Sequence, residues 1–279
     1  MSEPARAEND TAVSAKAKDG DGVFETIKVV FQALLIALVV RTFLFQPFNI
    51  PSGSLIPTLE IGDYLFVSKY SYGYSRSSFP CDFIYFNICN ERWFSGRVME
   101  STPKRGDIAV FRLPRDPTQD YIKRVIGLPG DTVYMSGGRL YINNVIVPRE
   151  EITKAHTTDF FGKESDVPTY KETLPDDKMA PGVSHRIIEL QGDNGVLDNT
   201  EKFVVPAGHY FMMGDNRDNS TDSRVPADAK QAGVGYVPIE NFVGRAELVF
   251  FSLKPGAAVW EFWKWPTSIR WSRMFQPVR

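Results

Sequence analysis

Residues 105–131, RGDIAVFRLPRDPTQDYIKRVIGLPGD, carry the pattern that decides the fold. Two runs within this stretch, Ile108–Leu113 and Tyr121–Ile126, mix β-branched and aromatic residues and are bounded by Gly, Pro and Asp. Such runs predict short strands that end at turns. Similar runs recur at Tyr64–Lys69, Arg139–Ile142, Arg186–Gln191, His209–Met213 and Glu247–Ser252. We therefore expect a mainly β protein with an antiparallel sheet at its core.

Composition agrees with this expectation. The chain of 279 residues is long enough for one or two domains with a sizeable core. Its 21 glycines and 19 prolines favour strands and turns over a helical bundle. The net charge is −2 and no basic run is present, so we expect no nucleic acid partner. Two stretches, Tyr74–Thr102 and Glu150–Ser184, look like insertions, and the second, polar and with three prolines, is expected to be an irregular loop.

The cysteines give no metal-binding pattern. Cys81 and Cys89 are eight positions apart, no CxxC spacing exists, and the histidines are scattered at His156, His185 and His209. A zinc site is therefore not expected. In an oxidising compartment the two cysteines can form a local disulfide, and two free thiols are the alternative.

Residues 27–48, IKVVFQALLIALVVRTFLFQPF, form a nearly continuous apolar segment. About 20 such residues are needed to cross the core of a bilayer. A cleaved signal peptide would need small residues after the apolar core, and this chain has bulky ones there. A buried amphipathic helix is the other alternative. We expect a retained transmembrane helix over residues 27–48, preceded by a disordered tail over residues 1–26.

The basic residues around this segment predict its orientation. Lys16, Lys18 and Lys28 precede the segment, whereas the next basic residue after Arg41 is Lys69. Because cytoplasmic flanks carry the excess of Lys and Arg, we expect the N-terminus in the cytoplasm and the main domain outside.

Two residues stand out chemically. Ser54 lies in PSGSLIPTLEIGD, residues 51–63, and by itself such a cluster indicates only a loop that leaves a membrane. Lys123 lies in a predicted strand between Tyr121 and Val125. On an apolar face, burial would lower the pKa of the lysine toward the value that a general base needs near neutral pH. The commoner alternative is a strand lysine whose ammonium group reaches the surface.

The acidic segment GDNRDNSTDSR, residues 214–224, invites a calcium-binding interpretation. An EF-hand loop that began at Asp215 would need Gly at its sixth position and Glu at its twelfth. This chain has Ser220 and Pro226 there, so we expect no such site and no cofactor or metal.

Four motifs follow one another behind the apolar segment. They are PSGSLIPTLEIGD (51–63), RGDIAVF (105–111), DYIKRVIGLPGD (120–131) and GDNRDNSTDSR (214–224). Together they resemble the bacterial type I signal peptidases, the Ser/Lys leader peptidases of the S26 class, over about residues 45–275. The resemblance implies a catalytic β core of residues 49–133 and 204–279 with a loop insertion at 74–102. It also implies an inserted β/loop domain of residues 134–203.

The resemblance implies a role for each matching residue. Ser54 would be the nucleophile and Lys123 the general base, a pairing that suits a hydroxyl activated by a neutral amine. The backbone N–H of Ser54 and the hydroxyl of Ser52 would form the oxyanion hole. The residues implied to support the site are Ser220, which would orient the Lys123 amine, Asp222, Arg224 and Arg124.

A shallow apolar site for an extended substrate is also implied. The matching residues are Phe48, Ile50, Leu55, Leu59, Val110, Asp120, Tyr121 and Ile122. Leu55 stands where the family usually has Met, which keeps the apolar volume. Small side chains at the cleavage site, as in A-x-A sequences, would suit such pockets.

The resemblance thus implies a membrane-anchored serine endopeptidase that removes signal peptides from exported preproteins through an acyl-enzyme intermediate. The implied partners are preproteins and the lipid bilayer, near the export machinery. The implied location is the bacterial inner membrane, with the catalytic domain on the periplasmic side.

Two alternatives stay open. One is a histidine-based serine hydrolase, although only His209 lies in a motif-bearing region and no GxSxG elbow surrounds Ser54. The other is a non-catalytic module that binds peptides at a sheet edge.

The C-terminal segment WEFWKWPTSIRWSRMF, residues 260–275, places four tryptophans near basic residues. This composition suits a membrane interface. A packed terminal segment with its tryptophans in the core is the alternative.

Overall fold

The computed structural model describes residues 19–78, 96–158, 164–176, 178–227, 233–257 and 260–279. The chain divides into two compact units, Met1–Val40 and Arg41–Arg279. Cys81 and Cys89 lie outside the described residues, so their pairing stays a prediction.

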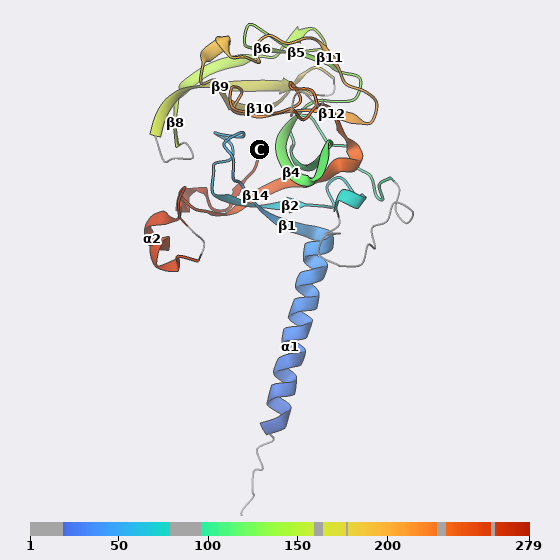
Figure 1. Cartoon of the computed structure of the whole chain (residues 1–279), viewed down its shortest axis with the longest axis vertical. Coiled ribbons are helices and arrows are strands. Elements are labelled where there is room, and N and C mark those ends of the chain that lie inside the picture. Colours follow the sequence, from blue (N-terminus) through green and yellow to red (C-terminus); the bar gives the residue numbers. More distant parts are fainter. Residues whose placement is uncertain (1–18, 79–95, 159–163, 177, 228–232, 258–259) are drawn as a thin grey trace, which may run out of the picture. The chain divides into compact units, whose positions relative to one another are not determined.

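The first unit contains helix α1, Asp19–Val39, which ends in a π-helical turn over Val40–Leu44 (Figure 1). Within the described residues it is the one helix long and apolar enough to cross a membrane. This span is Gly22–Leu44, with a mean hydropathy of 2.2 and none of it buried. The helix begins before the predicted bounds of 27–48 and ends before residue 48. Phe45–Asn49 forms strand β1, because its backbone groups pair with β2 in the main sheet.

The second unit is built around an eight-stranded antiparallel sheet. Its strand order is β1-β2-β14-β3-β4-β12-β13, and β15 pairs with β14. The strands are β1 Phe45–Asn49, β2 Asp63–Ser68, β3 Ile108–Leu113, β4 Asp116–Gly127, β12 His209–Met213, β13 Val237–Pro238, β14 Phe242–Ser252 and β15 Gln276–Pro277.

Two smaller antiparallel sheets lie between β4 and β12 in the sequence, with the orders β11-β5-β6-β7 and β10-β9-β8. Their strands are β5 Thr132–Ser136, β6 Arg139–Ile142, β7 Val145–Ile146, β8 Arg149–Thr158, β9 Glu164–Pro175, β10 Pro181–Ile188 and β11 Phe203–Val204. The predicted fold class is confirmed: a mainly β protein with an inserted β region and one N-terminal apolar helix.

The expectation of an irregular loop over residues 150–184 was wrong, because most of this stretch forms β8, β9 and β10. Its prolines sit where a sheet tolerates them. Pro168 falls at an irregularity in the β8–β9 pairing, between the Ile152 and Ala155 positions, and Pro175 pairs with Pro181 at the strand ends. Proline content alone therefore misled the prediction.

An apolar cluster joins the loop after β1 to the middle of the main sheet. Strands β1 and β4 are separated by three strands in the sheet order. The loop from Ile50 to Gly62 nevertheless packs Leu55 and Leu59 in one buried cluster with Val110 of β3. This burial holds the β1–β2 loop over the sheet near β4.

Short helical turns complete the second unit. They are Arg76–Ser78, Gly192–Asn194, Ile239–Asn241, Phe262–Lys264, α2 Trp265–Ser268 and Trp271–Arg273. In the C-terminal segment Trp260, Trp263 and Trp271 are 77%, 63% and 63% exposed. The alternative of tryptophans packed in the core is therefore wrong for these three residues.

A buried carboxylate fastens this C-terminal segment to the sheet. Asp63 of β2 is fully buried and accepts hydrogen bonds from Ser252, Arg270 and Arg273, at 2.7, 3.2 and 2.5 Å. Glu60 pairs with the same two arginines at 2.5 and 3.0 Å. Charge-assisted bonds of this kind are the stronger ones.

We expect Asp63→Ala to lower the free energy of unfolding by roughly 3–5 kcal/mol, because it leaves two largely buried guanidinium groups short of their partner. Glu201→Ala, at an exposed position, is the matched control and should change it by less than about 0.5 kcal/mol. Urea unfolding of the full chain in detergent measures both. Equal effects of the two substitutions would contradict the role of Asp63.

Candidate active site

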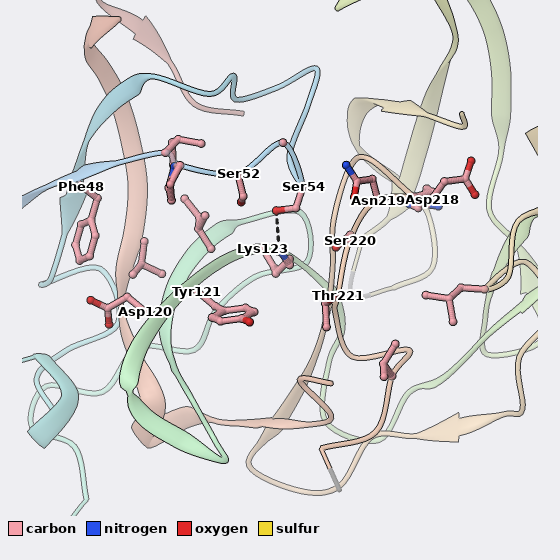
Figure 2. Close-up of a pocket in the computed structure, with 18 of the residues that line it drawn as sticks. Phe48, Ser52, Ser54, Asp120, Tyr121, Lys123, Asp218, Asn219, Ser220 and Thr221 are labelled. Atoms are coloured by element: carbon pink, nitrogen blue, oxygen red, sulfur yellow. Dashed lines mark hydrogen bonds between the residues drawn. The ribbon is translucent and has the colours of Figure 1, made fainter. Parts of the chain in front are cut away.

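An open cleft of about 720 Å³ runs along the second unit. Its walls come from the end of β1 and the following loop, from β4, and from the loop after β12 (Figure 2). The predicted site residues that line it are Phe48, Ile50, Ser52, Ser54, Val110, Asp120, Tyr121, Ile122, Lys123 and Ser220. Three segments distant in the sequence thus meet at one surface.

Ser54 and Lys123 are in direct contact in this cleft. The Lys123 Nζ donates a hydrogen bond to the Ser54 Oγ at 2.6 Å (Figure 2). The two residues are only 6% and 4% exposed, and the Tyr121 ring centroid is 5.6 Å from the amine. A serine hydroxyl and a lysine amine therefore meet in a largely desolvated place.

Burial sets the protonation of this lysine. It lowers the pKa of Lys123 from 10.5 to about 8, because the ammonium form loses its hydration. The carboxylates of Asp222 and Asp215 raise this pKa and the Arg224 guanidinium lowers it further, but each effect is smaller than that of burial. At pH 8 about half of the Lys123 amine is therefore neutral and able to accept a proton.

The loop from Ile50 to Gly62, which carries Ser54, is called the serine loop. Hydrogen bonds hold it against the segment after β12. Asn216 donates its backbone N–H to the Ser54 carbonyl and its side-chain amide to the Gly53 carbonyl, both at 3.1 Å. A Cβ on Gly214 would overlap the Ser220 side chain and the Ser54 carbonyl. The two segments can approach this closely because residue 214 has no side chain.

A buried ion pair joins β4 to the same segment. Arg124 donates to both carboxylate oxygens of Asp215, at 2.8 and 2.7 Å, and to the Gly106 carbonyl at 2.8 Å. Thr58, in the loop that carries Ser54, donates to Asp215 at 2.6 Å. Burial alone would raise the pKa of Asp215, but Arg124, His185 and Thr58 together outweigh it and the pKa is lowered. Asp215 thus stays ionised and links all three segments.

Asp222 and Arg224 form a second buried pair. Arg224 donates to both oxygens of Asp222 at 2.9 Å, and the Gly214 N–H donates to Asp222 at 3.0 Å. Arg224 also donates to the Arg217 carbonyl at 2.6 Å. These bonds fix the turn of chain that presents Ser220 to the cleft.

Two further predicted site residues, Ser220 and Ser52, line the cleft. The Ser220 Oγ is buried in the cleft but has no hydrogen-bond partner among the described residues, so it does not contact the Lys123 amine here. Ser52 lines the cleft and is exposed.

Leu55 and Leu59 do not line the cleft. Both are buried in the cluster beneath the serine loop, at 1% and 0% exposure. The chain turns back after Ser54, with the Leu59 N–H bonded to the Leu55 carbonyl at 2.9 Å, and this turn directs both side chains into the core.

Sequence reasoning missed one wall of the cleft. This wall contains Gln191, Val196, Leu197, Asp218, Asn219 and Thr221. Asp218, Asn219 and Thr221 stand within the motif of residues 214–224, so the motif itself was a signal for them. The segment 191–197 carries no motif, and only the folded chain shows that it belongs to the cleft.

The histidines lie elsewhere. His185 is buried, with its Nε2 3.6 Å from Glu172 and 3.7 Å from Asp215, and burial lowers its pKa to about 4. The His209 Nδ1 lies 2.9 Å from the Ala207 carbonyl. Neither side chain lines the cleft, and the side chain of His156 lies outside the described residues.

A serine in contact with a buried lysine, beside a cleft open enough for an extended chain, is the arrangement of serine hydrolases whose base is a lysine. Comparison with known proteins agrees with this class. Residues 23–251 match the model of the family described as signal peptidase, peptidase S26. The chain belongs to this family, which confirms both the resemblance and the predicted enzyme class, a serine endopeptidase.

Individual relatives of this chain are named signal peptidase I. A signal peptidase I of Rickettsia typhi is 39% identical over 245 residues, which are 85% of each chain. A signal peptidase I of Pseudomonas aeruginosa is 39% identical over 248 residues, 88% of this chain and 78% of its own. A crystal structure of a signal peptidase I from Enterococcus faecalis is 26% identical and covers 52% of this chain and 97% of its own. Its TM-score of 0.28 is too low to bear on the fold.

The buried lysine has a consequence for stability. Between pH 8 and 10.5 the unfolded chain keeps a proton on Lys123 that the folded chain has lost, so the free energy of unfolding rises with pH across this window. We expect the difference in stability between Lys123→Met and the parent protein to favour the variant most below pH 8. This advantage should shrink by about 3 kcal/mol by pH 10.5.

Chemical unfolding of both proteins at several pH values measures this difference. Lys104→Met, at an exposed position, is the matched control and should show no such trend. A difference independent of pH would show that the Lys123 amine keeps its ordinary pKa.

Proposed function

We propose that this protein removes signal peptides from preproteins at a membrane, with Ser54 as the nucleophile and Lys123 as the general base. The observation that carries the proposal is the 2.6 Å contact between the Lys123 Nζ and the Ser54 Oγ in a buried setting. Membership of the signal peptidase family and relatives named signal peptidase I supply the substrate class.

The reaction follows from this contact. The neutral Lys123 amine takes the proton of the Ser54 hydroxyl as its oxygen attacks the peptide carbonyl carbon. The resulting tetrahedral intermediate loses the amine of the mature chain, to which the Lys123 ammonium gives its proton. The signal peptide stays on Ser54 as an ester. Water, activated by the same amine, then hydrolyses this ester and restores the serine.

An oxyanion hole belongs to the same proposal. The Ser54 N–H donates to no acceptor among the described residues, and the exposed Ser52 hydroxyl lines the same cleft. Two donors aimed at the developing oxyanion would stabilise the transition state, and losing one such donor costs roughly 3–4 kcal/mol in other hydrolases.

Ser220 is proposed to hold the Lys123 amine when Ser54 moves away to attack. Its buried Oγ has no hydrogen-bond partner in the described structure, so it can accept a hydrogen bond from the Lys123 ammonium. Asp222 and Arg224 support this position through the turn that they fix. Arg124 acts farther back, through Asp215.

The substrate is proposed to lie extended along β4 and the end of β1. Phe48, Ile50, Val110, Tyr121 and Ile122 present apolar surface there, and Asp120 lies at the rim of the cleft. Shallow apolar walls suit small side chains before the scissile bond, as in A-x-A sites.

The membrane arrangement is proposed from the sequence and the helix. Gly22–Leu44 is long enough to span a bilayer, and the basic residues before it favour a cytoplasmic N-terminus. The catalytic unit would then lie on the periplasmic side of the inner membrane, close to the export machinery. Residues 134–203 are proposed as the inserted domain of that unit.

We expect Ser54→Ala and Lys123→Met each to lower preprotein cleavage by at least about 10⁴-fold, because each removes a partner of the reacting pair. Ser101→Ala and Lys104→Met, both at exposed positions, are the matched controls and should retain full activity. Cleavage of a preprotein in detergent, followed by gel analysis, measures all four. Thermal unfolding checks that the variants remain folded.

Substantial turnover by either site variant would refute the serine–lysine pair. Unchanged function of Ser54→Ala in peptide binding, together with no turnover by the parent protein, would favour the alternative of a non-catalytic peptide-binding module.

The pH dependence gives a second test. Because the neutral lysine is the active form, we expect kcat/KM to rise about tenfold per pH unit below the pKa of about 8 and to level off above it. A variant with His156, His185 and His209 all replaced by Gln should show the same rise of kcat/KM with pH, although its stability will be lower. Loss of this rise in that variant would favour a histidine base.

A further inference from the structure

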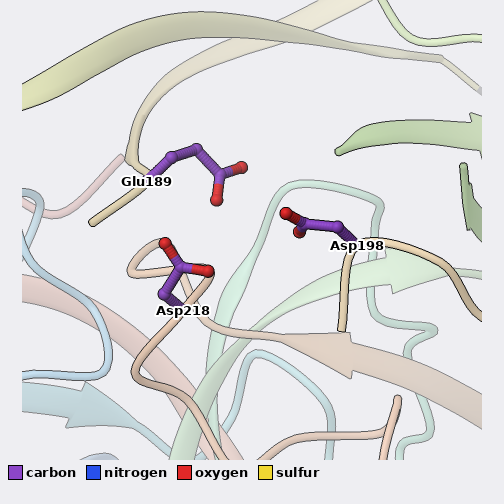
Figure 3. Close-up of side chains that lie close together, drawn as sticks. All are labelled: Glu189, Asp198 and Asp218. Carbon is purple, nitrogen blue, oxygen red and sulfur yellow. The ribbon is translucent and has the colours of Figure 1, made fainter. Parts of the chain in front are cut away.

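A second group of titratable side chains lies beside the cleft, apart from the serine–lysine pair. Glu189 follows β10, Asp198 lies in the loop before β11, and Asp218 follows β12. One carboxylate oxygen from each lies within 4.8 Å of the others. Figure 3 shows the three carboxylates turned toward a common space.

Glu189 is fully buried, and neither of its carboxylate oxygens has a hydrogen-bond partner among the described residues. The Arg149 Nη1 lies 3.6 Å from the Glu189 Oε1, beyond hydrogen-bond distance. Arg149 donates instead to the Gly138 carbonyl at 2.9 Å and to Asp193 at 2.7 Å. A buried carboxylate without a hydrogen-bond donor is costly, so the ion pair with Arg149 still leaves Glu189 without the donors that its position demands.

The other two carboxylates are held by backbone bonds. The Asp198 Oδ2 accepts from the Gly195 N–H at 2.5 Å, and the Asp218 Oδ2 accepts from the Gln191 N–H at 2.7 Å. These bonds fix the positions of the two side chains but bring no positive charge. Each residue keeps its second carboxylate oxygen for another partner.

The neighbouring guanidinium groups do not balance the cluster. Burial raises the pKa of Glu189 to about 8, even though Arg217 and Arg149 act to lower it. The Arg217 side chain donates to both oxygens of Glu172 and to the Gly214 carbonyl, so it is committed elsewhere. Neither guanidinium therefore donates a hydrogen bond to the place where the three carboxylates meet.

We propose that Glu189, Asp198 and Asp218 bind a calcium ion. Calcium takes carboxylate oxygens at about 2.3–2.6 Å in irregular geometry, so ligands on opposite sides of one ion lie up to about 5 Å apart. Oxygens within 4.8 Å of one another can reach a single ion with little movement. Magnesium needs shorter bonds and a nearly ideal octahedron, which suits it less.

The site is unrelated to the EF-hand pattern that residues 215–226 lack. Its ligands come from three segments, and only Asp218 belongs to the acidic motif. A motif within one stretch of sequence therefore cannot predict this site. The oxygen ligands that complete the coordination sphere would be water or backbone carbonyls.

The ion would join the two segments that form this wall of the cleft. Gln191, Val196 and Leu197 line the cleft from the segment between Glu189 and Asp198. Asp218 stands two residues before Ser220 on the other segment. A Cβ on Gly195 would overlap the Asp218 carboxylate, so the two segments are already in close contact. Calcium thus acts as a structural clamp beside the reacting groups.

The test uses the full chain in detergent, stripped with EDTA and titrated with CaCl₂ from about 10 μM to 10 mM, a range that brackets structural calcium sites. We expect saturable heat of binding by calorimetry. We also expect a rise in Tm of roughly 5–10 °C at a hundred times the dissociation constant. Glu189→Gln should abolish both signals. Glu201→Gln, the same change at an exposed position, should leave both intact.

Three outcomes would overturn the proposal. The first is no calcium-dependent change in the parent protein. The second is equal loss in Glu189→Gln and Glu201→Gln, which would indicate unspecific screening of charge. The third is a higher Tm for Glu189→Gln at pH 7 without any calcium effect, which would show that the carboxylates share a proton in place of a cation.

Discussion

The burial of the Lys123 amine is the constraint on which the rest of this site depends. A buried ammonium is unfavourable, and that penalty is what brings the pKa of Lys123 down to about 8. A neutral Lys123 amine can activate Ser54 only if the two residues lie within hydrogen-bond distance. Ser54 follows β1, and three strands separate β1 from β4, which carries Lys123. The apolar cluster beneath the serine loop, which includes Val110 of β3, brings the two residues together. The fold thus places the reacting pair by burial rather than by proximity along the chain.

The charges around Lys123 have to be arranged so that they do not undo the effect of burial. Asp215 and Asp222 both lie close enough to raise its pKa. Each is paired with its own arginine, Arg124 and Arg224, through two hydrogen bonds. Pairing compensates most of each negative charge locally, so desolvation remains the larger influence on the lysine. The Arg124–Asp215 pair, with Thr58, also connects β4, the serine loop and the segment after β12, so one set of contacts supplies both electrostatic balance and position.

Local patterns predicted the parts of this structure that local chemistry determines. The strands at 108–113, 139–142 and 209–213 have the predicted bounds, because alternating apolar side chains and flanking turn residues specify them. Residues 150–184 were misassigned as an irregular loop, since Pro168 is accommodated by an irregularity that depends on the neighbouring strand. Phe48 and Ile50 reach the cleft as expected. Leu55 and Leu59 do not, because the direction of a side chain after a turn depends on how the loop packs. The wall formed by 191–197 had no local signal at all.

The same physics indicates why a lysine and not a histidine serves this site under the proposed mechanism. Burial disfavours the cationic form of both side chains. Burial lowers the pKa of His185 to about 4, despite the carboxylates of Asp215 and Glu172. A base this weak would remove a serine proton inefficiently. The pKa of a lysine starts about four units higher, at 10.5, and burial in the cleft leaves the pKa of Lys123 at about 8. In so desolvated a cleft, only a group of high intrinsic basicity remains a useful base near neutral pH.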